Sequence, residues 1–121
     1  MGMNLSRLED GSVFECSNGM WGIIIESASK AGWKPIGTFK MDANDNPDPN
    51  WDKNDYSSHQ GQIVNEDDAF EMSKALKKFV EIEKENIDPI EYSTILRFIE
   101  WLKIEDYEDD GIDYFPGFEI N

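Results

Sequence analysis

The chain has almost none of the side chains that bind metals through sulfur or imidazole. Its 121 residues include one cysteine, Cys16, and one histidine, His59. One cysteine cannot form an intramolecular disulfide or a cysteine-based zinc site, and one histidine cannot build a multi-histidine metal centre. This composition is typical of a reducing compartment, so we expect a cytoplasmic protein.

Long apolar runs are also missing from the sequence. The N-terminal stretch MGMNLSRLEDGS lacks the apolar core of a signal peptide. No other run approaches the roughly 20 apolar residues that cross a bilayer. We therefore expect neither a leader segment nor a membrane partner.

Familiar catalytic signatures are absent as well. The sequence contains no GxxxxGK[ST], GxGxxG or GxSxG motif, so it lacks the usual phosphate-binding loops and the nucleophile elbow. Cys16 and His59 could act as a nucleophile and its base only if the fold brought them together, and nothing in the sequence indicates this. We predict no catalytic residue and no cofactor, and we expect a protein that is not an enzyme.

What the chain has in abundance is negative charge. Asp and Glu total 26 against 11 Lys and Arg, which gives a formal net charge of -15 and a pI near 4.2. Such a field repels phosphate groups, so nucleic acid and anionic membranes are disfavoured partners. It attracts cations and basic proteins. The alternative is that the acidity only maintains solubility.

The first of three predicted amphipathic helices covers residues 19–31. Asn18 precedes it as the expected N-cap, and Gly32 follows it at the position of a left-handed C-cap. The β-branched run Ile23, Ile24 and Ile25 within it would also suit a strand.

Two further helices have clearer start signals. One begins after Asn65 as N-cap, with three acidic residues in its first turn and an apolar residue every three or four positions. The other begins after Asp88, with Pro89 at the first helical position and Glu91 completing a capping box. Both patterns predict helices with one buried face.

Strand signals are confined to the two ends of the chain. Residues 11–17, GSVFECS, predict one short strand, and Phe118 and Ile120 alternate around Glu119 as in an edge strand that pairs near Phe14. The alternative for the C-terminal segment is an exposed recognition tail. We therefore predict one domain over 1–121 that is mainly α with a small β element (α+β): three amphipathic helices and a short ribbon formed by the two ends.

A long Asn/Asp/Pro-rich loop, 40–61, separates the first two helices. Its sequence MDANDNPDPNWDKND places oxygen-bearing side chains two residues apart, as in an EF-hand loop. In the best register, which starts at Asn44, Pro49 occupies the position that requires a glycine. We predict a turn-forming segment and no metal site. The weak metal candidates are Asn44, Asn46, Asp48, Asp52 and Asp55.

Four tryptophans could form a ligand platform or part of the core. Trp21 and Trp101 lie in predicted helices and are expected in the core. Trp33 and Trp51 lie in or beside the long loop. Because large exposed aromatic side chains are rare outside binding patches, we expect these two to fold the loop back onto the core.

Several motifs resemble those of a set of small acidic bacterial proteins of unknown function. They are the turn GWKPIGT, the segment QGQIVNEDDAFEMSKALKKF, the run ILRFIEWL and the C-terminal GFEI. The resemblance covers most of residues 19–120. It implies a helix that ends in a Gly-Trp-x-Pro-x-Gly-Thr turn and a Gly-Gln-x-Val segment that leads into a helix, and it implies no activity.

The leading functional hypothesis is a non-catalytic acidic protein-binding module of the bacterial cytoplasm, immunity-like or inhibitor-like, that recognises a basic protein. The predicted contact residues lie in the long loop and in the acidic C-terminal region: Asp48, Trp51, Asp52, Asp55, Tyr56, Glu105, Asp106, Asp109, Asp110 and Asp113.

Two other classes of function are consistent with the sequence. One is a protein that binds a small ligand or a divalent cation, or an enzyme, using loop 42–59 with Trp51 and His59. The other is a structural subunit that associates with itself through an apolar helix face.

Overall fold

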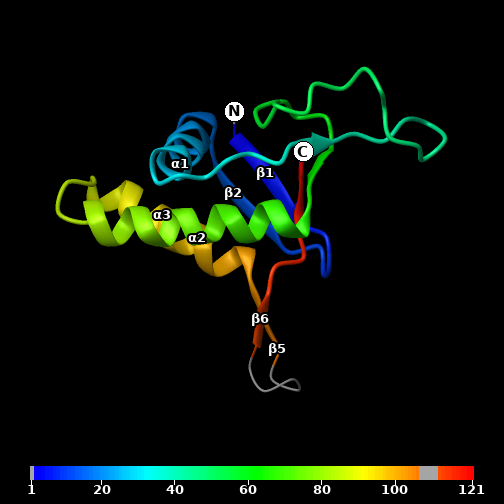
Figure 1. The fold of residues 1–121 in the computed structure, drawn as a ribbon. Coiled ribbons are helices and arrows are strands. Elements are labelled where there is room, and N and C mark those ends of the chain that lie inside the picture. The colour runs from blue at the N-terminus through cyan, green and yellow to red at the C-terminus, as the bar shows by residue number, and fades with distance from the viewer. Residues whose placement is uncertain (1, 107–111) are drawn as a thin grey trace.

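The computed structural model describes residues 2–106 and 112–121. Within these residues it contains three helices and seven strands (Figure 1). None of these helices has the length and apolar character needed to cross a membrane. In chain order the elements are β1 (Gly2–Arg7), β2 (Val13–Ser17), α1 (Asn18–Lys30), β3 (Thr38–Phe39), β4 (Gln62–Val64), α2 (Glu66–Glu83), α3 (Pro89–Leu102), β5 (Ile104–Asp106), β6 (Ile112–Tyr114) and β7 (Phe118–Ile120).

Five of the strands form one antiparallel sheet in the order β2-β1-β7-β4-β3. The last strand of the chain, β7, is therefore the central strand, with Ile120 between Leu5 of β1 and Gln62 of β4. Strands β5 and β6 form a separate two-stranded sheet that follows α3 and extends away from the other elements (Figure 1).

The predicted fold class, mainly α with a short ribbon from the two ends, is wrong. The protein is a small α+β fold whose sheet has five strands. Strands β3, β4 and β7 have two or three residues each, which is too short to produce a period of two in the sequence. Strand β1, GMNLSR, contains no β-branched or aromatic residue that would mark it as a strand.

The position predicted for the C-terminal strand is also wrong. Phe118 and Ile120 do form a strand, and β2 covers the predicted segment near Phe14. The two strands are not neighbours, however, because β1 lies between them. The alternation of Phe118 and Ile120 around Glu119 indicates which side chains share a face of the sheet. An edge strand and a central strand show the same alternation, so the pattern does not indicate the position of the strand in the sheet.

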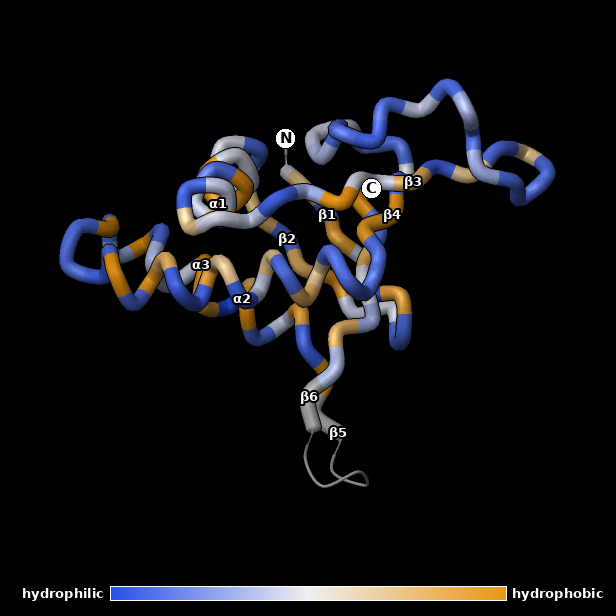
Figure 2. The backbone as a smooth tube through the Cα atoms, viewed as in Figure 1, coloured by the Kyte–Doolittle hydropathy of each residue, from blue (hydrophilic) through white to orange (hydrophobic). Residues whose placement is uncertain are grey.

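One face of the sheet forms the core against the three helices. Leu5, Phe118 and Ile120 are fully buried on this face, whereas Asn4 and Glu15 on the other face are exposed. The connection from β3 to β4 contrasts with the strands because most of its positions are hydrophilic (Figure 2). The long loop therefore adds little apolar surface to the core through its sequence as a whole.

The helix starts follow the predictions closely. The N-caps of α2 and α3 are Asn65 and Asp88, as predicted. Helix α1 is capped by Ser17, whose hydroxyl accepts a hydrogen bond from the backbone N–H of Met20, so the predicted cap at Asn18 is wrong by one residue. A serine one residue earlier provides an equally good oxygen acceptor. Gly32 adopts φ +102, which confirms the predicted left-handed end of α1.

A glycine substitution tests how closely the central strand approaches its neighbour. Gly117 has φ +84, and a Cβ atom there would lie 2.6 Å from the backbone oxygen of Val64. Gly117→Ala should lower the free energy of unfolding by about 3 kcal/mol, from left-handed strain and backbone overlap together. Gly11→Ala is the matched control, since Gly11 has φ +72 and open space around it. It should cost about 1 kcal/mol. Equal costs in urea denaturation would contradict the predicted close approach.

Candidate functional site

Four aspartates of the long loop form turns within the loop itself. Each of four aspartates accepts a hydrogen bond from the backbone N–H two residues ahead, the pattern of an Asx turn. The pairs are Asp42 with Asn44, Asp48 with Asn50, Asp52 with Asn54, and Asp55 with Ser57. Turn formation accounts for the spacing that resembles a calcium loop.

Two of the weak metal candidates, Asn44 and Asn46, belong to the turn around Asp42. Asn44 and Asn46 each donate a backbone N–H to the carboxylate of Asp42. Asp55 accepts hydrogen bonds from the Ser58 hydroxyl and from backbone N–H groups, and these hold the pKa of its carboxyl below the usual range. In the part of the chain that the structure describes, no three His, Cys, Asp or Glu side chains are grouped so that they could hold a metal ion.

The aromatic residues of the loop point inward, as predicted. The Trp51 side chain is half-buried, and its indole N–H donates to the Thr38 hydroxyl at 2.9 Å. Tyr56 is 5% exposed and packs edge-on against Trp33 with 5.2 Å between ring centroids. Tyr56 is therefore a core residue and is not available to a partner.

A buried carboxylate, that of Asp68 in the first turn of α2, connects the loop to the core. It is fully buried and accepts hydrogen bonds from the indole of Trp33 at 2.9 Å, the backbone N–H of Ile36 at 3.2 Å and the phenol of Tyr56 at 2.5 Å. The Tyr56 oxygen in turn accepts from the backbone N–H of Gly37. A buried carboxylate requires such donors to offset its lost hydration.

This cluster of Asp68, Tyr56 and Trp33 gives the GWKPIGT turn a structural role. Sequence reasoning assigned Asp68 only to the helix dipole and therefore missed it. The sequence feature that could have identified Asp68 is its position as the third helical residue. In the structure its side chain turns toward the core, whereas Glu66 and Asp67 are exposed. Asp68 is fully buried, and its role is in the fold.

The acidic residues predicted near the C-terminus divide into two groups. Glu105 and Asp106 belong to β5 and Asp113 belongs to β6. Asp109 and Asp110 lie outside the described residues, so their role stays a prediction.

Cys16 and His59 are far apart in the sheet topology. Cys16 is in the outer strand β2 and His59 precedes β4, with β1 and β7 between these strands. Burial raises the pKa of the Cys16 thiol, and the His59 ring lies 3.1 Å from the carbonyl oxygen of Asn121. The two side chains do not form a nucleophile and base pair.

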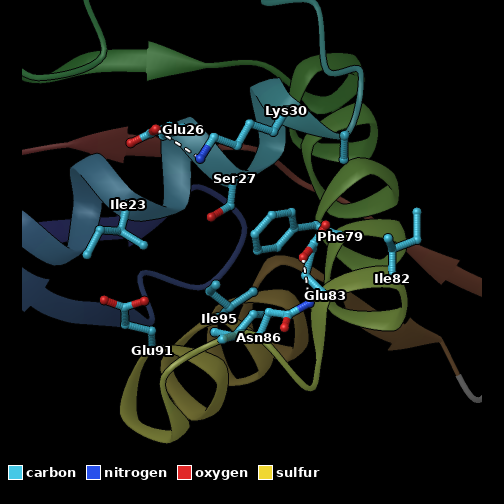
Figure 3. Close-up of a pocket in the computed structure, with 12 residues that line it drawn as sticks. Ile23, Glu26, Ser27, Lys30, Phe79, Ile82, Glu83, Asn86, Glu91 and Ile95 are labelled. Atoms are coloured by element: carbon cyan, nitrogen blue, oxygen red, sulfur yellow. Dashed lines mark hydrogen bonds and ion pairs between the residues drawn. The ribbon is translucent and has the colours of Figure 1, made fainter.

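The strongest candidate site is a groove between α1, the C-terminal half of α2 and the start of α3 (Figure 3). Its volume of about 470 Å³ is within the range of pockets that bind small molecules or anchor side chains. Ile23, Phe79 and Ile95 provide apolar surface from three different helices. We refer to it as the helical groove.

Carboxylates from all three helices surround the apolar surface of the helical groove. Glu26 pairs with Lys30, the one basic residue that lines the groove, at 3.2 Å. Glu83 accepts a hydrogen bond from the side chain of Asn86 at 3.3 Å. Glu91 is half-buried and its carboxylate has no ion-pair or hydrogen-bond partner among the described residues.

Exposed apolar side chains extend the same surface. Ile90 at 76% and Ile82 at 64% are the most exposed large hydrophobic side chains among the described residues. Ile82 lines the helical groove, and Ile90 is adjacent to Glu91. Exposed apolar groups that border a concave surface are typical of interaction sites. Sequence reasoning missed this site because it assigned Glu91 only to a capping box and did not single out Ile82 or Ile90.

Comparison with models of protein families, with curated proteins and with solved structures found no match to this chain. The resemblance to small acidic bacterial proteins is not tested by this result and stays a prediction. The functional argument therefore depends on the geometry and charge of the chain itself.

Substitution of Asp68 tests the buried carboxylate. Asp68→Asn keeps the size of the side chain but places an amide donor against groups that are themselves donors. We expect the free energy of unfolding to fall by about 2–4 kcal/mol, because buried donors lose their acceptor. Asp67→Asn, an exposed neighbour with the same change of charge, should cost about 0.5 kcal/mol. Urea denaturation measures both, and similar losses would contradict the role of Asp68.

Alkaline pH tests the same cluster from the Tyr56 side. Burial, with the hydrogen bond to Asp68, raises the pKa of Tyr56 far above its ordinary value. The phenol of Tyr56 ionises near pH 10 in the unfolded chain but stays protonated in the folded protein. Its contribution to the free energy of unfolding is therefore fully present below about pH 10. Above that pH the contribution falls by up to about 1.4 kcal/mol per pH unit. The stability difference between wild type and Tyr56→Phe should therefore shrink above about pH 10 in urea denaturation. A difference independent of pH would contradict this.

Proposed function

We propose that the protein is a non-catalytic acidic binding module of the bacterial cytoplasm that recognises a basic protein. The observation that carries the proposal is the helical groove, where apolar surface from three helices meets carboxylates from the same helices. Interfaces commonly combine an apolar centre with a charged rim.

The net negative charge of the chain supports a partner with net positive charge. At -15 the whole chain attracts a basic protein over a distance of about a Debye length and speeds its encounter at low salt. Among the described residues no ion pair involves Glu91, so a cation from a partner would have a carboxylate ready to receive it in the groove. The same field disfavours nucleic acid as a partner.

The proposal places the contact in the helical groove, and the acidic segment 105–113 stays a separate predicted contact. Glu91 is in the first turn of α3, whereas Glu105 and Asp106 are in β5, which follows the last turn of α3. A single experiment can distinguish them because each offers a pair of carboxylates to neutralise.

Affinity capture tests the proposal. The immobilised protein is exposed to a lysate of its source organism at low salt, and bound proteins are eluted with a salt step and identified by mass spectrometry. Three variants, each with two fewer negative charges, are compared with wild type: Glu83→Gln with Glu91→Gln in the groove, Asp109→Asn with Asp110→Asn, and Glu15→Gln with Glu71→Gln as control. We expect the groove variant to bind the captured basic protein about tenfold more weakly and the control variant to match wild type. A loss of binding in the Asp109 and Asp110 variant measures the separate contribution of the acidic segment.

The other outcomes separate the alternatives. If only the Asp109 and Asp110 variant loses binding, the module binds a basic protein through its C-terminal acidic segment and the groove assignment is wrong. Equal losses in all three variants would mean capture by net charge alone, and absence of any captured basic protein would overturn the proposed function.

A further inference from the structure

We infer that the helical groove binds an amphipathic α-helix of the basic partner, with an apolar side chain on the groove floor and a lysine or arginine against Glu91. The inference rests on the proposed function and deepens it by specifying the conformation and side-chain pattern of the bound segment.

The backbone chemistry of the groove favours a helical occupant. The residues that line the groove belong to the three helices, to the connection between α2 and α3 or, for Ala31, to the C-cap of α1, and none of them belongs to a strand. Away from its ends a helix has its N–H and C=O groups bonded internally, so helical walls offer an extended peptide few hydrogen-bond partners. A buried extended segment would leave its own amides unsatisfied, whereas a helix satisfies its amides itself.

The spacing of groove residues also matches a helix. On α3, Glu91 and Ile95 are four residues apart, and on α2, Phe79 and Glu83 are four residues apart. Each helix thus presents one carboxylate and one apolar side chain separated by one turn, about 5–6 Å. A partner helix with a cation and an apolar residue at the same interval could satisfy one such pair with a single turn.

Figure 3 shows how these side chains converge. Phe79 and Ile95 extend between the helices, and Glu91 lies on the side of the groove opposite Glu83. Lys30 is held by Glu26 at 3.2 Å, so its charge is already compensated at the rim. A cation that enters the groove therefore meets Glu91 as its unpaired counter-ion among the described residues.

Synthetic peptides test the occupant directly. The first is a peptide of about 18 residues built from Leu, Lys and Ala, with leucines spaced three and four apart so that they share one helix face. A second has the same composition with leucines distributed around the helix, and a third replaces lysine by glutamine. Binding to the intact protein is followed by fluorescence anisotropy, and peptide helicity by circular dichroism.

We expect the first peptide to bind and gain helicity. Glu91→Gln and Ile82→Ser should each weaken its binding about fivefold. Ile82 is 64% exposed, so its replacement leaves the core intact. Leu8→Ser is the matched control, because Leu8 is exposed and lies outside the groove. It should bind the peptide as wild type does.

Three results would overturn the inference. If the first two peptides bind equally, charge alone attracts them and the helical occupant is wrong, while the proposed function stands. If no peptide binds although a basic protein is captured from lysate, the partner does not bind through an amphipathic helix, and only the inference is wrong. If the capture experiment also fails, the proposed function is wrong too. If size exclusion shows wild-type dimers that Ile82→Ser abolishes, the groove is an interface between copies of the chain.

Discussion

The buried carboxylate of Asp68 constrains much of the molecule. None of the salt bridges among the described residues involves it, so its charge must be stabilised by hydrogen bonds that come from elsewhere in the chain. Those donors are Trp33 and the backbone of Ile36 after α1, and Tyr56 at the end of the long loop. One side chain thus fixes the exit of α1, the return of the loop and the start of α2 relative to one another.

The same constraint prepares the candidate binding surface indirectly. Helices α1 and α2 form two walls of the helical groove, and the Asp68 cluster joins them at the end of α1. A preformed concave surface needs less ordering when a partner binds, and this raises affinity. In the long loop, in contrast, four aspartates form Asx turns and the aromatic side chains pack toward the core. Few of its side chains therefore remain available to bind a ligand or a partner.

Local signals in the sequence were sufficient for some parts of the fold and insufficient for others. Asn65 and Asp88 marked two helix starts correctly because an N-cap acts on N–H groups two or three residues away. The sheet was underestimated because the pairing of Leu5 with Ile120 joins opposite ends of the chain. Strand β7 is too short to show a period of two, and β1 lacks the β-branched and aromatic residues that mark a strand. The groove was missed for the same reason: Ile82 and Glu91 become neighbours of α1 only after three helices pack together.

The central position of β7 has a consequence for how the chain reaches its native state during synthesis. Strands β1 and β2 form one hairpin, and β3 and β4 form another pair, but the two pairs meet only through residues 118–120. Until the ribosome has released that segment, both halves present unpaired strand edges to other molecules. Before residues 118–120 are in place the nascent protein is therefore exposed to aggregation, and its high negative charge provides repulsion between chains during that interval.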